Sequence, residues 1–85
     1  PMKLAKLIDT LTTLLNADRR EQLRRYDEMK TVLRKLRRKR NELLDELEQA
    51  EGEEREKIQR RLDIVIAERA RGIAILRELK KARDA

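Results

Sequence analysis

The sequence contains no histidine, no cysteine and no serine. Nucleophile–base pairs of the Ser–His or Cys–His kind, thiolate or imidazole zinc sites and disulfide bonds are built from these residues, so their absence excludes these features. The two glycines are isolated from each other and cannot form a glycine-rich phosphate-binding loop. We therefore expect no enzyme activity, no cofactor, no metal site and no small-molecule substrate.

Aromatic residues and turn formers are also scarce, with Tyr26 as the only aromatic residue and a single proline in 85 residues. Charged residues make up 47% of the chain, and a composition rich in leucine, arginine, glutamate and lysine is typical of long helices and coiled coils. A chain this short buries only about 60% of its unfolded surface, so it gains stability from helix pairing or oligomerisation. No signal peptide is visible, and we expect a cytoplasmic protein.

The apolar residues are densest in residues 62–76, where they point to nearly every side of a helix. A helix that is apolar on most faces is usually covered on most faces. The segment is shorter than the roughly 20 apolar residues of a membrane span, and it includes charged residues. We therefore expect a central helix that other helices surround. A buried strand is the alternative, because isoleucine and valine are β-branched, but no turn residues bracket the segment.

The hydrophobic spacing predicts three helices, over residues 3–15, 19–50 and 53–83. Asp18 and Glu21 have the spacing of a capping box at the start of the second helix. This helix also has a seam with alternating three- and four-residue steps, which is typical of coiled coils. The seam consists of Tyr26, Met29, Leu33, Leu36, Arg40, Leu43, Leu47 and Ala50.

The heptad pattern loses its phase at Gly52, which predicts a helix end and a chain reversal there. A single continuous helix through Gly52 is the alternative. In the antiparallel arrangement, Leu33 lies opposite Gly72 and Tyr26 lies opposite Leu79.

The predicted fold is all-α: one domain over residues 1–85, with a long antiparallel, coiled-coil-like helical hairpin and a short N-terminal amphipathic helix. We expect this three-helix unit to dimerise into a larger bundle. The first helix covers part of the third helix if the chain turns back at residues 16–18, and a second copy of the chain covers the rest. The candidate oligomer interface consists of Leu4, Leu7, Ile8, Leu11, Leu14, Ile66 and Ile73.

The charges are unevenly distributed, with a net charge of +7 over residues 18–41 and −6 over residues 42–57. The basic run at residues 34–40 is a candidate surface for phosphates or for a protein partner. A solvated face or protein-binding patch is favoured over nucleic acid, since no aromatic residues lie nearby for base stacking, and an anionic membrane surface is the third alternative. The candidate binding residues are Arg34, Lys35, Arg37, Arg38, Lys39 and Arg71.

Arg40 lies in the seam of the second helix, and Arg69 lies in the matching seam of the third helix. The third-helix seam consists of Ile58, Leu62, Val65, Arg69, Gly72, Leu76 and Leu79. The side chains of Arg40 and Arg69 either extend out to solvent along their aliphatic stems or set the register and the oligomeric state. The favoured function is a non-catalytic helical interaction or adaptor module that forms homodimers and binds a protein partner. The alternative is a basic helical protein that binds nucleic acid through residues 34–40.

Overall fold

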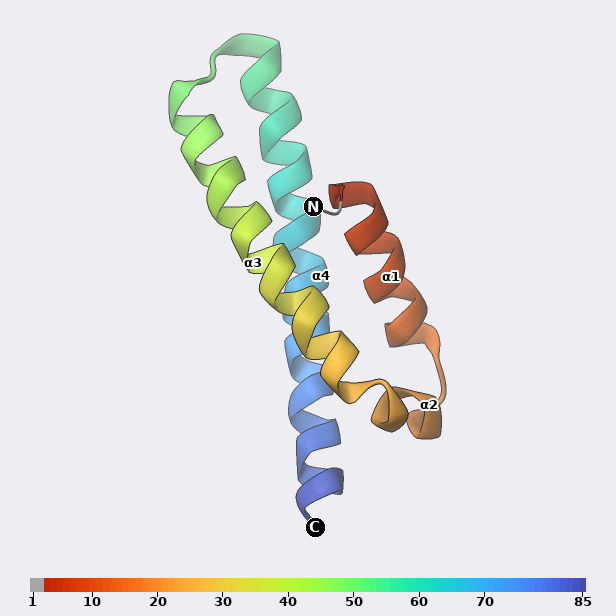
Figure 1. Ribbon diagram of the computed structural model, residues 1–85. Coiled ribbons are helices and arrows are strands. Elements are labelled where there is room, and N and C mark those ends of the chain that lie inside the picture. The colour runs from red at the N-terminus through yellow and green to blue at the C-terminus, as the bar shows by residue number, and fades with distance from the viewer. Residues whose placement is uncertain (1–2) are drawn as a thin grey trace.

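The computed structural model describes residues 3–85, and these residues form an all-α structure without strands. The molecule is elongated, with extents of 49 × 20 × 19 Å, and it has one hydrophobic core (Figure 1). The predicted all-α class is confirmed. The helices are α1 (Leu4–Asn16), α2 (Arg19–Arg24), α3 (Tyr26–Gln49) and α4 (Gly52–Asp84).

Helix α1 packs against both α3 and α4 through its apolar stripe. Leu7, Leu11 and Leu14 are at most 1% exposed, so this short helix contributes a large share of the core. An isolated helix of this length is marginal in water, and burial of the stripe supplies the stability that it lacks alone. The apolar surface of the predicted amphipathic helix is therefore used within the chain.

The corner between α1 and α2 is stabilised by two side chains. The Asp18 carboxylate accepts a hydrogen bond of 2.8 Å from the backbone N–H of Glu21, so Asp18 is the N-cap that the sequence predicts. The buried Gln22 amide donates to the carbonyl oxygens of Leu14 and Leu15, at 3.1 and 3.2 Å. These carbonyls belong to the last turn of α1, where carbonyls lack helical i+4 donors. The Leu14 carbonyl also accepts the backbone N–H of the C-cap Ala17 at 3.3 Å, so Gln22 and Ala17 together close the end of α1.

The prediction of a single helix over residues 19–50 is wrong, because two helices, α2 and α3, meet at Arg25. Arg25 has φ −103° and ψ 22°, outside the helical region. No proline or glycine lies at this break, and tertiary contacts account for it. The break allows Gln22 to face α1 while Tyr26 enters the hydrophobic core. On the same side of the break as Gln22, Arg19 forms an ion pair with Glu78 of α4 at 3.3 Å.

Helices α3 and α4 lie side by side and run in opposite directions, and we call them the α3–α4 pair (Figure 1). The chain reverses between the C-cap Ala50 and Gly52, the first residue of α4, which has a positive φ of 60°. An L-residue with a side chain rarely adopts this conformation, which accounts for glycine here. The reversing end of the pair extends beyond α1 (Figure 1).

Leucines of α1 and α3 pack closely against Gly72 of α4. A Cβ atom on Gly72 would lie 2.6 Å from Leu33 Cδ2 and 3.3 Å from Leu11 Cδ1. The predicted pairing of Leu33 with Gly72 is therefore present, and the missing side chain provides the space that two leucines fill.

The central segment, residues 62–76, is covered only in part by the rest of the chain. Leu62, Val65 and Gly72 are buried, but Ile64 and Ile66 are 53% and 48% exposed. The expectation that other helices surround this segment is thus not met among residues 3–85, because α1, α2 and α3 contact α4 but leave Ile64 and Ile66 about half exposed.

We expect Gln22→Leu to lower stability by about 1–3 kcal/mol, because it removes the side-chain donor to the Leu14 and Leu15 carbonyls. In a chain of this size the midpoint of thermal unfolding should fall by about 4–8 °C per kcal/mol. Circular dichroism melting measures this shift. The control is Gln59→Leu, since Gln59 is exposed and bonds only Asp63. Equal melting of the two variants would contradict the role of Gln22.

We expect Gly72→Val to destabilise the fold by about 1–3 kcal/mol through overpacking against Leu33 and Leu11. Ala70→Val is the matched control, because Ala70 lies on the exposed side of the same helix and receives the same side chain. Urea unfolding of both variants separates the steric effect from the helix propensity of valine. A control variant as unstable as Gly72→Val would show that the close approach is unimportant.

Candidate functional site

The exposed large apolar side chains lie on two different sides of the molecule. Leu44 is 43% exposed, Ile64 53% and Ile66 48%. At about 100° per residue, Ile64 and Ile66 point to nearly opposite sides of α4. Ile64 lies on the side of α1, and Ile66 lies on the side that α1 leaves open. The molecule therefore has two separate surfaces with exposed apolar side chains.

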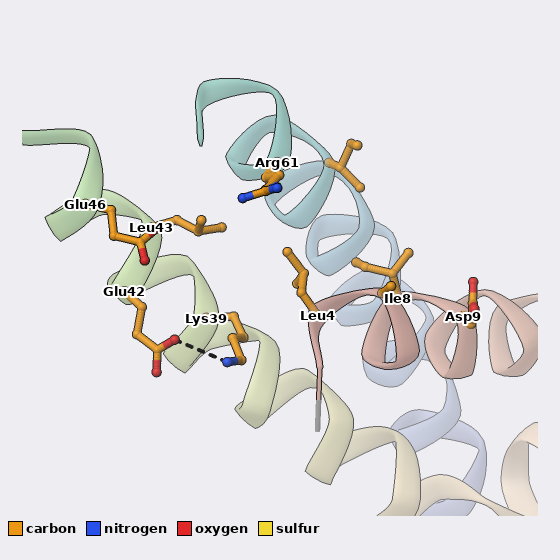
Figure 2. Close-up of a pocket in the computed structure, with 10 residues that line it drawn as sticks. Leu4, Ile8, Asp9, Lys39, Glu42, Leu43, Glu46 and Arg61 are labelled. Atoms are coloured by element: carbon orange, nitrogen blue, oxygen red, sulfur yellow. Dashed lines mark ion pairs between the residues drawn. The ribbon is translucent and has the colours of Figure 1, made fainter. Parts of the chain in front are cut away.

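The first surface is an open groove of about 610 Å³ where the N-terminal end of α1 meets the α3–α4 pair, and we call it the α1-end groove (Figure 2). Its charges are mixed: Lys39 forms an ion pair with Glu42 at 3.3 Å, and Arg61 extends from α4 near Leu43 (Figure 2). The lining residues are Leu4, Ala5, Ile8, Asp9, Lys39, Glu42, Leu43, Glu46, Arg61 and Ile64.

The second surface lies on the opposite side of the α3–α4 pair, and we call it the arginine face. Residues three or four apart on a helix share one side, so α3 and α4 each present a stripe in which arginine and apolar side chains mix. These stripes contain Arg37, Arg40 and Leu44 from α3, and Ile66, Arg69 and Ile73 from α4.

Arg69 lies at the centre of the arginine face. Its Nε donates to the backbone carbonyl of Leu33 at 3.3 Å, which connects α4 to α3. The pKa of Arg69 is lowered below its usual value. Partial burial is the largest cause, and repulsion from Arg40 and Arg37 adds to it. Three positive charges are therefore close enough to repel one another at the junction of the two helices.

No carboxylate neutralises this cluster. Within residues 3–85, neither Arg37, Arg40 nor Arg69 has a carboxylate oxygen within 4.0 Å. Arg40 donates instead to the neutral amide oxygen of Asn41, at 3.3 and 3.1 Å. The arginine face therefore combines an uncompensated positive charge with exposed apolar side chains.

Two of the candidate binding residues are paired with carboxylates. Lys39 is paired with Glu42, and Arg71 is paired with Glu68 at 3.2 Å. Arg34 and Arg38 lie four residues apart and share the exposed side of α3, with Lys35 three residues before Arg38. Arg37 lies between this side and the rest of the arginine face.

The predicted oligomer interface is also divided. Leu7, Leu11 and Leu14 are buried in the core of the chain itself, which removes them from any surface that a second copy could reach. Leu4 and Ile8 are half-buried and line the α1-end groove. Ile66 and Ile73 lie on the arginine face instead.

Sequence reasoning missed Gln22, Leu44 and Ile64. Gln22 carries no local signal, since its role depends on the turn that brings α2 to the end of α1. Leu44 lies next to a seam position, and Ile64 lies within a continuous apolar run. Because Leu44 and Ile64 lie outside the seam positions, the sequence could have predicted that these two side chains stay exposed.

Among residues 3–85, no helix is long and apolar enough to cross a membrane, and no cluster of acidic residues could hold a metal ion. Comparisons with protein-family models, with curated proteins and with solved structures find no significant match to this chain.

We expect Arg69→Met to raise stability by about 1 kcal/mol, because it removes a partly buried charge that two arginines repel. The carbonyl of Leu33 keeps its helical hydrogen bond. Added salt should stabilise the wild type more than the variant, since it screens this repulsion. Thermal melts at low and high salt measure both effects. Arg71→Met, which removes a paired arginine, should give no gain, and a gain there would point to a general effect of net charge.

Proposed function

We propose that this chain is a non-catalytic helical interaction module that self-associates and binds a protein partner. In this proposal α3 and α4 act as a coiled-coil-like helical hairpin that holds α1 and presents two surfaces. The exposed apolar side chains Leu44, Ile64 and Ile66 carry the proposal, because they lie in two separate places on a small, highly charged chain.

The chemistry of the side chains supports a non-catalytic role. The sequence has no histidine, cysteine or serine, so carboxylates and lysine are the main acid–base groups that remain. The α1-end groove contains Asp9, Glu42 and Glu46, but these line an open surface, and Glu42 is paired with Lys39. Binding is therefore the simpler use of the groove.

Self-association is assigned to the α1-end groove. The groove carries both acidic and basic side chains, so a two-fold contact can place Glu42 or Glu46 of one copy near Arg61 of the other. Ile64, Leu4 and Ile8 supply apolar surface for the same contact. The arginine face is less suited to a second copy, because a two-fold contact there would bring like charges together.

Sedimentation velocity over a wide range of protein concentrations tests this assignment. We expect the wild type to form a dimer and Ile64→Glu to be monomeric, since it places a charge in the apolar part of the groove. Ile66→Glu is the matched control, with the same substitution at a similarly exposed residue on the other side of α4. A wild type that stays monomeric at every concentration would rule out self-association.

Nucleic-acid binding is the second candidate function. One observation favours it: Arg34, Lys35, Arg37 and Arg38 have no carboxylate within 4.0 Å among residues 3–85. Phosphates would be attracted to such side chains, and the binding would be sensitive to salt.

Binding of labelled mixed-sequence duplex DNA and RNA at about 50 mM and about 200 mM salt tests this candidate. The nucleic-acid function predicts binding that weakens steeply with salt and is lost when Arg37, Arg38 and Lys39 are all replaced by glutamine. An absence of binding at the lower salt concentration would eliminate it.

A further inference from the structure

We propose that the arginine face binds an acidic amphipathic helix of another protein. The inference rests on the proposed interaction function and names the partner chemistry at one surface. The bound helix would lie along the junction of α3 and α4, on the side opposite α1, where it would complete a bundle to which the chain contributes α1, α3 and α4.

The apolar side chains of this face set the position of the partner helix. Leu44 lies near the reversing end of the α3–α4 pair, Ile66 lies further along, and Ile73 follows one helical turn beyond Arg69. The stretch of α3 from Leu33, opposite Gly72, to Leu44 spans about eleven residues, or about 16 Å. A partner helix with leucines at positions i, i+4, i+7 and i+11 would match this length and periodicity.

The charges determine the chemistry of the partner. Among residues 3–85, Arg37, Arg40 and Arg69 form a positive cluster without a carboxylate within 4.0 Å. Burial and the charges of Arg40 and Arg37 lower the pKa of Arg69. Carboxylates that flank an apolar stripe would accept bidentate hydrogen bonds from these guanidinium groups and remove their repulsion. An acidic helix thus satisfies the apolar and the charged parts of the face together.

Other occupants satisfy only one part of the surface. A second copy packed by two-fold symmetry would bring two arginine clusters together, which like-charge repulsion opposes. A nucleic-acid backbone would pair with the arginines but leave Leu44 and Ile66 exposed. Helix α1 already occupies the other side of the pair. A protein helix with flanking carboxylates is the occupant that both features favour.

Two synthetic peptides test the inference. The first is a capped helical peptide of about eighteen residues, with leucines at i, i+4, i+7 and i+11 and glutamates at the flanking positions. The second is the same peptide with every glutamate replaced by glutamine. Fluorescence anisotropy gives the Kd of each peptide for the full chain. We expect the glutamate peptide to bind at least about tenfold more tightly, with an advantage that shrinks as salt is raised.

Variants of the chain locate the binding site. Replacing the exposed Arg37 by glutamine should weaken binding of the glutamate peptide. The double variant Arg37→Gln with Arg69→Gln should weaken this binding further. Ile66→Glu should abolish binding, whereas Ile64→Glu should leave it unchanged. Circular dichroism of each variant confirms that the helices are retained.

Several results would overturn the inference. These are equal Kd values for the two peptides, no binding of either peptide, or binding that is lost in Ile64→Glu but kept in Ile66→Glu. Dimer dissociation caused by Ile66→Glu would assign the face to a second copy. Duplex RNA that binds more tightly than the peptide and depends on Arg69 but not on Ile66 would assign it to nucleic acid.

These outcomes are separable from failure of the proposed function. A chain that dimerises through Ile64 but does not bind the glutamate peptide contradicts only this inference. A chain that binds the peptide but remains monomeric contradicts only the self-association.

Discussion

The close approach of three helices at Gly72 is the constraint on which the rest of the structure depends. Leu33 of α3 and Leu11 of α1 fill the space that a side chain at this position would occupy. This contact holds α3 near α4 and brings α1 into the groove between them. It thereby determines which apolar residues are buried, and it leaves Leu44, Ile64 and Ile66 at the surface.

The position of α1 gives the α3–α4 pair two unlike sides. On the side of α1, acidic and basic residues lie together around the α1-end groove. This mixture of charges would allow two copies of the chain to pack against each other there. On the other side, Arg37, Arg40 and Arg69 carry like charges next to Ile66 and Ile73. Arg40 and Arg69 are partly buried while Arg37 is exposed. Placing like charges at a partly buried junction lowers stability, and carboxylates of a bound partner would offset this cost.

Much of the fold was predictable from the sequence, because local signals specify the helical class, the stripe of α1, the Asp18 cap and the pairing of Leu33 with Gly72. The break at Arg25 was not predictable, since residues 19–30 contain no helix breaker and the break depends on distant contacts of Gln22 and Arg19. The candidate surfaces were predictable only in part. The sequence identifies Arg40, Arg69, Ile66 and Ile73, but only the packing of α1 decides that Leu7, Leu11 and Leu14 are buried.

The most direct test of the two-sided account is an NMR titration of the isotope-labelled chain with the acidic helical peptide. The Nε–Hε signals of Arg37, Arg40 and Arg69 and the methyl signals of Leu44, Ile66 and Ile73 should shift together in a saturable manner. The methyl signals of Ile8 and Ile64, on the other side of the pair, should stay in place. Shifts confined to Ile8 and Ile64, or arginine shifts without any methyl shift, would contradict the account.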